Sequence, residues 1–268
     1  MNLVYFNLAV ALAVLGGVTS SIQAAPVTVI NPGFEDISGE STFNEFTFGP
    51  LNGWDLYDPN GITNGGAGNT YFIGTLRPTA PTYFTAGAPE GQRVGIAFNF
   101  EGSGGNGEYG MSQTLTETLQ ANTRYTLQVD IGNIASGTGL NGDFFNLDGF
   151  PGYRVDLLAG GVLLAQDNNS LSGLIGEGDF SLSSFSFQTG ATHAQLGQSL
   201  EIRLVNLNQI DAAFPAADLE VDFDNVRLSA TSVPEPSSFG WLAIAFAAWW
   251  KRPQKRPRAG SRSHARPE

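Results

Sequence analysis

The sequence predicts an all-β protein, an antiparallel β-sandwich (jelly roll), followed by a short C-terminal membrane helix. Apolar and polar residues alternate with period two in several short segments, most clearly in 124–131, where Tyr125, Leu127, Val129 and Ile131 share one face. Turns rich in glycine and asparagine separate these segments, and the chain has 34 glycines. Between residues 26 and 230 no segment of convincing length shows the helical repeat. Many short strands separated by turns are typical of sandwiches.

The remaining strands follow from the same pattern. A hairpin is expected where Gly160 and Gly161 join two apolar segments, and one slip in the alternation of 180–187 predicts a β-bulge. Segments 58–88, 101–110, 133–149 and 208–218 are expected to be mainly loops. The other expected strands are 27–30, 54–57, 93–98, 111–115, 153–158, 162–165, 180–187, 200–205 and 219–228.

The N-terminal segment predicts export. Residues 3–18 are strongly apolar, and small residues follow them up to Ala25, which is the pattern of a secretory signal peptide over residues 1–25. A retained N-terminal membrane helix is the alternative. Cleavage after Ala24 or Ala25 would leave residues 26–230 as one β domain.

Charge divides the chain into two opposite parts. Residues 26–230 hold six arginines and 23 acidic residues, a net charge of −17, whereas the seven other basic residues follow position 250. An acidic body repels phosphates, so nucleic-acid binding is not expected. The chain has no cysteine, which excludes disulfides, thiolate metal ligands and a cysteine nucleophile.

The C-terminal end has three parts in order. Val233, Pro234, Glu235 and Pro236 open a rigid polar segment, residues 239–250 are uncharged and apolar, and basic residues follow to position 258. This order resembles the PEP-CTERM sorting signal of Gram-negative bacteria, here over 231–258 with a disordered tail at 259–268. The resemblance implies an exosortase-type processing enzyme as partner, transient anchoring in the inner membrane, and then a cell-surface or extracellular location. A buried helix or a disordered tail is the alternative, since twelve apolar residues are short for a membrane span.

A second resemblance concerns the body. The Asn-Pro-Gly-Phe-Glu turn at 31–35, Gly-Trp at 53–54, the segment 112–129 and the last strand at 221–228 follow an order similar to that of the galactose-binding-like jelly roll of many carbohydrate-binding modules. The resemblance implies a structural Ca²⁺ held by Glu35 and Asp224, with Asp36 and Asp222 as outside candidates. Carboxylates are suitable ligands for this hard cation, and two solvated turn carboxylates are the alternative.

One group of residues suggests catalysis. Glu220, Asp222 and Asp224 alternate with apolar residues, so that all three project from one strand face and could hydrolyse a glycosidic bond. A solvated outer face of an acidic sandwich gives the same alternation. We therefore expect no catalytic residues here, and the glycosidase remains an alternative.

Aromatic residues in or beside the loops could form a platform for sugar rings, although core packing is the default role of each. These residues are Tyr57, Tyr71, Phe72, Tyr83, Phe84, Tyr109, Phe144 and Phe145. The sequence thus predicts an exported, non-catalytic surface or matrix protein that binds extracellular polysaccharide through unidentified residues. A structural or adhesive matrix protein without a sugar site is the first alternative.

Overall fold

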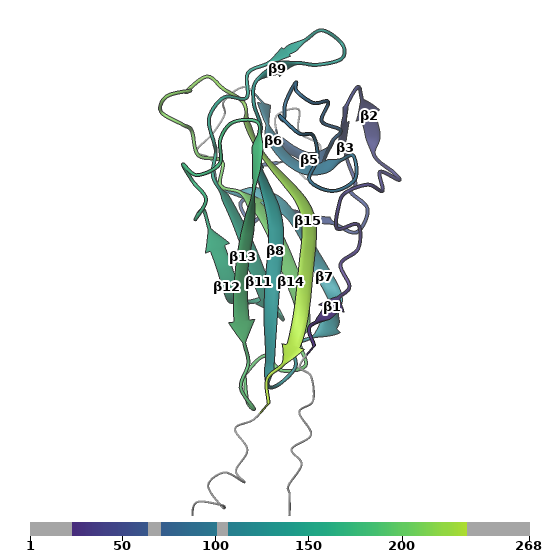
Figure 1. Ribbon diagram of the computed structural model, residues 1–268, viewed down its shortest axis with the longest axis vertical. Coiled ribbons are helices and arrows are strands. Elements are labelled where there is room, and N and C mark those ends of the chain that lie inside the picture. The colour runs from purple at the N-terminus through teal and green to yellow at the C-terminus, as the bar shows by residue number, and fades with distance from the viewer. Residues whose placement is uncertain (1–22, 64–70, 101–106, 235–268) are drawn as a thin grey trace, which may run out of the picture. The chain divides into compact units, whose positions relative to one another are not determined.

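The computed structural model describes residues 23–63, 71–100 and 107–234. Two antiparallel sheets pack face to face as a β-sandwich, so the all-β prediction is confirmed (Figure 1). The predicted sorting motif from Glu235 onward, the apolar segment 239–250 and most of the signal peptide lie outside the described residues. Within the described part of the chain, no helix is both long and apolar enough to span a membrane.

The larger sheet has eight strands, with β15 near its centre. β15 pairs with β8 on one side and with β6 and β1 on the other. In spatial order the strands are β13 (Asp179–Gln188), β8 (Thr123–Asn133), β15 (Leu219–Ser232), β6 (Val94–Asn99), β5 (Tyr71–Leu76), β3 (Phe46–Phe48) and β2 (Ser41–Phe43), with β1 (Ala25–Val27) also beside β15.

The smaller sheet has five strands and forms the second layer. Its strands in spatial order are β12 (Val162–Asn168), β11 (Tyr153–Ala159), β14 (Ser199–Asn206), β7 (Tyr109–Thr118) and β4 (Asp55–Tyr57). A separate two-stranded hairpin, β9 (Gly137–Thr138) with β10 (Phe144–Phe145), lies at one end of the sandwich, and β1 lies near the other (Figure 1).

The main core lies between the two sheets. Val221 and Phe223 of β15 point into it, beside Leu127, Val129 and Ile131 of β8, and all five side chains are fully buried. Burial of side chains of this size stabilises the fold by about 1.5–3 kcal/mol each. Because side chains alternate along a strand, the even-numbered residues of β15 from 220 to 224 must face the opposite side of the sheet.

That opposite, outer face is not solvated. A second apolar cluster covers it, in which Ile96 and Phe98 of β6 pack under Tyr83 and Phe84 from the 77–93 loop and under Ile134 after β8. Phe84 stacks on Phe180 of β13 with ring centroids 4.3 Å apart. The larger sheet is therefore buried on both faces at this end.

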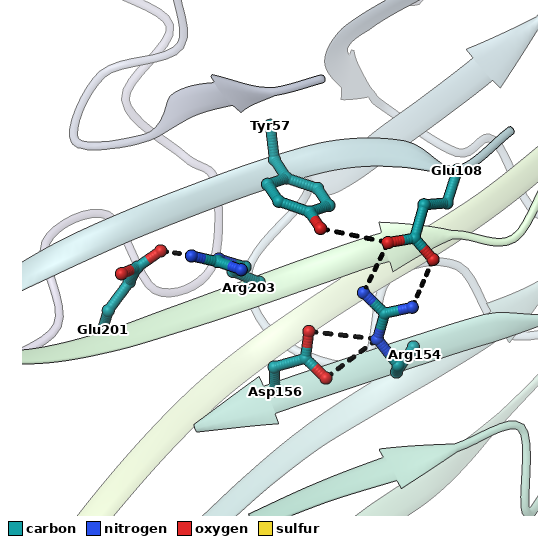
Figure 2. A network of polar contacts seen from close by, with 6 residues as sticks. All are labelled: Tyr57, Glu108, Arg154, Asp156, Glu201 and Arg203. Carbon is teal, nitrogen blue, oxygen red and sulfur yellow. Dashed lines mark hydrogen bonds and ion pairs between the residues drawn. The ribbon is translucent and has the colours of Figure 1, made fainter. Parts of the chain in front are cut away.

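The outer face of the smaller sheet carries ion pairs instead (Figure 2). The Arg154 guanidinium donates to both carboxylate oxygens of Glu108, at 2.8 Å for the Nη2–Oε1 contact, and its Nε donates to Asp156. The hydrogen bonding of Glu108 to Arg154 lowers the pKa of Glu108, whereas burial raises the pKa of Asp156. Arg203 pairs with Glu201 and lies over the Tyr57 ring.

Two segments predicted to be mainly loop also contain short strands, and the predicted bulge is wrong. Segment 58–88 contains β5, and segment 133–149 contains the β9–β10 hairpin. β13 pairs with β8 in continuous register, so the expected bulge at 180–187 is absent. The slip in alternation arises because Phe180 faces the outer cluster, whereas Phe185 and Phe187 pack on the main core. A register shift lies instead in β15, between Asp224 and Arg227.

Candidate active site

The floor of the candidate site is the outer face of the larger sheet. Phe72, Phe98 and Glu220 stand directly opposite one another on β5, β6 and β15. The next row contains Ile96, Asp222 and Gly132 on β6, β15 and β8. Residues opposite each other in antiparallel strands share a face, so both carboxyls lie among apolar side chains.

Glu220 and Asp222 are both almost completely buried, at 2% and 0% exposure. Among the described residues no group outside the pair donates a hydrogen bond to these four carboxyl oxygens. An unpaired buried carboxylate is costly, so such a group retains its proton instead. Burial raises the pKa of Glu220, helped by the nearby Asp218, and burial together with the charge of Glu220 raises the pKa of Asp222 well above its usual range. A hydrogen bond between the two carboxyls makes this rise in pKa smaller for Glu220 and larger for Asp222. The pair can therefore hold a proton at neutral pH.

Glycine makes room for this pair. A side-chain carbon on Gly132 would lie 2.5 Å from the Phe180 ring and 2.8 Å from Cβ of Asp222. Since real side-chain carbons do not approach so closely, only glycine at position 132 allows Phe180 to pack across the sheet beside Asp222.

A pocket of about 200 Å³ lies next to the carboxyls on the same sheet face. Among the described residues its lining consists of phenylalanine side chains, Phe43, Phe46, Phe48, Phe72, Phe98, Phe100 and Phe145. Phe98 connects the pocket to the acid pair. It stands opposite Glu220 in the sheet, and its ring centroid lies 4.9 Å from that of Phe72. Such a predominantly apolar pocket suits a flat aromatic ligand.

A second polar pair lies behind the pocket wall. Tyr83 is completely buried and donates its hydroxyl to Glu45 Oε1 at 3.0 Å. Burial and this carboxylate raise the pKa of Tyr83, so that its hydroxyl remains a donor. Tyr83 also packs edge-on against Phe46, which lines the pocket.

The proposed calcium ligands hold a loop beside this site. Glu35 accepts hydrogen bonds from the Gln92 and Arg93 amides at 2.6 and 2.7 Å, and Asp224 accepts one from the Glu90 amide at 2.8 Å. Burial raises the pKa of Asp224 to about 8, with Glu90 and Asp130 adding to the shift. No cluster of three or more histidine, cysteine, aspartate or glutamate side chains suited to a metal occurs among the described residues.

The outcome for the other expected residues is mixed. Asp36 is in an exposed turn with Ser38 and Asn52, apart from the buried acid pair. Of the aromatic residues proposed for sugar binding, only Phe72 and Phe145 line the pocket. Tyr83, Phe84 and Tyr109 are core residues, Tyr57 lies under Arg203, and Phe144 is 68% exposed. The side chain of Tyr71 lies outside the described part of the structure.

Comparison with known proteins identifies the family. Residues 25–229 match the HpiC1-like family, described as HpiC1 cyclase. The chain belongs to the HpiC1-like cyclase family. A cyclase from Fischerella sp. TAU is 39% identical, covering 80% of this chain and 100% of that one, with a TM-score of 0.68. Comparison with curated proteins finds no match.

Two related structures contain small molecules. A Stig cyclase, Fisc, from Fischerella sp. TAU was solved in complex with (3Z)-3-(1-methyl-2-pyrrolidinylidene)-3H-indole, and a cyclase from the same source with 4-(1H-Indol-3-yl)butan-2-one. Each is 38% identical to this chain, covers 79% of it and 100% of its own length, and has a TM-score of 0.67.

These findings correct the sequence-based identity. Recognition of the chain as a PEP-CTERM protein with a carbohydrate-binding-module-like domain is wrong, because the folded body belongs to a cyclase family. The non-catalytic matrix protein, its structural alternative and the glycosidase are wrong for the same reason. A polysaccharide partner is also wrong, since the relatives bind indole compounds. The solvated outer face expected for Glu220, Asp222 and Asp224 is wrong too, because all three are buried.

Proposed function

We propose that this protein is an acid-catalysed cyclase that closes a ring on an indole-containing small molecule. The observation that carries the proposal is the buried, donor-free pair of Glu220 and Asp222 beside a pocket lined by phenylalanine. The indole ligands of the related cyclases support the substrate class. We further propose that the sandwich is of the jelly-roll type, as its strand order crosses repeatedly between the two sheets.

The phenylalanine pocket accounts for binding. An indole ring can stack on phenyl faces, and the pocket excludes water from the reacting atoms. Phenyl faces also stabilise a developing positive charge, which a protonated substrate carries during cyclisation. The carboxyl pair lies on the same sheet face as the pocket floor, so a bound ligand over Phe98 would meet Glu220.

The acid pair accounts for the chemistry. The protonated carboxyl donates its proton to one carbon of an alkene in the substrate; the π bond breaks, which leaves a carbocation on the neighbouring carbon and a carboxylate on the protein. The electron-rich indole then attacks the cation and forms the carbon–carbon bond of the new ring. Loss of a proton from the indole carbon that formed the new bond restores aromaticity and returns a proton to the carboxylate. Substrate and product are isomers, so no oxidant or reductant is consumed.

The experiment uses the full chain and an indole that carries an alkene chain, with the cyclised isomer followed by chromatography and mass spectrometry. We expect Asp222→Asn and Glu220→Gln to reduce turnover by roughly 100-fold or more, as the loss of a general acid does. Binding of 4-(1H-indol-3-yl)butan-2-one should remain within about threefold of wild type, because both replacements preserve shape. Glu201→Gln on the other sheet is the matched control. Unchanged turnover in both site variants would exclude the acid pair from catalysis.

Two further proposals rest on the sequence. We propose a structural Ca²⁺ bound near Glu35 and Asp224, supported by carboxylates that converge on the 90–93 loop.

We also propose export, supported by the signal-peptide pattern of residues 1–25. N-terminal sequencing of the protein from its host tests the second, and an intact Met1 in all fractions would exclude cleavage.

A further inference from the structure

The β9–β10 hairpin supplies one wall of the phenylalanine pocket. Phe145 of β10 lines the pocket and packs on Phe46 of the sheet with ring centroids 5.3 Å apart. The tip of the hairpin is exposed, with Leu140 at 71% and Phe144 at 68% exposure. Only two residue pairs join β9 to β10. A short hairpin of this kind is marginal alone, so contacts with the body must hold Phe145 in place.

Glu45 makes those contacts from beneath the hairpin. It precedes β3, its side chain is 3% exposed, and its Oε1 and Oε2 accept the Leu140 amide proton at 3.2 and 3.3 Å. The same carboxylate accepts the Tyr83 hydroxyl at 3.0 Å. One buried carboxylate therefore joins the sheet, the 77–93 loop and the tip of the hairpin.

Close packing reinforces the contact. A side-chain carbon on Gly139 would lie 2.9 Å from Glu45 Oε1 and 3.1 Å from the Tyr83 hydroxyl. The hairpin backbone thus rests directly on the carboxylate, without a side chain between them. The Glu45 side chain accepts from the Tyr83 hydroxyl and the Leu140 amide at the same time, so this single group joins the short hairpin to the body.

We infer that Glu45 is a positioning residue of the cyclase, which holds the 137–145 hairpin closed and thereby fixes Phe145 as a wall of the substrate pocket. This inference rests on the proposed function for the meaning of the pocket, but the closed hairpin is testable without turnover. Glu45 does not line the pocket, so it acts through Phe145 and Tyr83 and not by contact with substrate.

Glu45→Gln is the informative substitution. It preserves side-chain volume but offers one oxygen where the carboxylate offers two, and its amide N–H₂ would face one of the two donors. The Tyr83 hydroxyl and the Leu140 amide then compete for a single neutral acceptor. Glu40→Gln is the control, because Glu40 is a partly buried acid near Glu45 in the chain that accepts a hydrogen bond from the Thr47 hydroxyl and not from the hairpin.

Hydrogen exchange of the full chain is the first measurement. We expect exchange in peptides covering 137–145 to accelerate at least tenfold in Glu45→Gln, while peptides from β8 and β15 keep wild-type rates. Glu40→Gln should leave the hairpin unchanged. Wild-type exchange in the hairpin, or an equal acceleration throughout the chain, would refute the inference, the second because it would show general destabilisation.

Ligand release and product ratio are the second measurement. We expect Glu45→Gln to release 4-(1H-indol-3-yl)butan-2-one at least tenfold faster, and to change the ratio of cyclised isomers because the Phe145 wall is displaced. Faster hydrogen exchange in the hairpin, combined with unchanged ligand release and an unchanged product ratio, would refute the role of Glu45 in positioning Phe145. If no variant, nor the wild type, cyclises any indole, the proposed function fails, whereas the exchange and release results still decide the role of Glu45.

Discussion

Replacing the buried acid Glu220 by glutamine should stabilise the protein at alkaline pH and not at acidic pH. The wild-type carboxyl is buried without a hydrogen-bond donor outside the acid pair among the described residues, and burial raises its pKa from 4.5 to about 8. Glutamine has nearly the same shape and never ionises. It can also donate a hydrogen bond to Asp222, which would favour the ionised form of that neighbour.

The magnitude follows from proton linkage. Below pH 4.5 the folded and unfolded states both hold the Glu220 proton, so wild type and variant should differ by less than about 1 kcal/mol. Between pH 4.5 and about 8 the unfolded state releases the proton while the folded state retains it, so wild-type stability falls as pH rises. At about 1.36 kcal/mol per pH unit, the stability lost across this window reaches about 5 kcal/mol. Glu220→Gln removes this loss.

Urea denaturation of the full chain between pH 4.5 and 8.5 measures the effect, with the fluorescence of the buried Trp54 as the signal. The relevant quantity is the difference between variant and wild type at each pH, because carboxyls other than the adjacent Asp222 titrate equally in both. The difference should grow steadily with pH. A difference that is constant with pH, or a variant that is less stable throughout, would show that Glu220 is an ionised and well-paired group, and would refute our account of the acid pair.

Three further predictions concern other parts of the molecule. Arg154→Met should lower the free energy of unfolding by about 2 kcal/mol near pH 7, because it removes the cation that pairs with partly buried carboxylates. In urea denaturation this loss of stability should become smaller at acidic pH, where Glu108 is protonated, because Arg154 lowers the pKa of Glu108 in the wild type. Gly132→Ala brings a methyl carbon 2.5 Å from an aromatic carbon and should cost about 1–3 kcal/mol, whereas Gly190→Ala, with 3.9 Å to the nearest atom, should be neutral in thermal denaturation. If calcium binds, a chelator should lower the Tm of wild type but not that of Glu35→Ala, and equal Tm values with and without chelator would exclude a structural ion.

The strand content could be predicted from the sequence because it depends on local patterns. The hairpin around Gly160 and Gly161 has both strands where the alternation places them. β5 escaped prediction because it is short and stands among glycine, threonine and proline residues, where local composition favours loops. Its strand conformation depends on pairing with β6 and β3, which local sequence does not specify.

The candidate site was only partly predictable. Alternation in β15 correctly places Glu220, Asp222 and Asp224 on one face, but it cannot specify what covers that face. The cover comes from residues such as Tyr83 and Phe145, distant in sequence and brought to the sheet by loops. Burial therefore changes three carboxyls that looked solvated into groups with raised pKa values.

β15 also limits how the chemistry of this protein can change. Before the register shift in this strand, Val221 and Phe223 fill the main core, while Glu220 and Asp222 form the acidic floor of the site. Any movement of the acid pair would disturb the sandwich interior, so the floor is rigid and tolerates few substitutions. The covering loops and the β9–β10 hairpin are not constrained in this way. New product specificity, in evolution or in the laboratory, should therefore arise from changes in the covering loops and the β9–β10 hairpin, while the acidic residues of β15 stay unchanged.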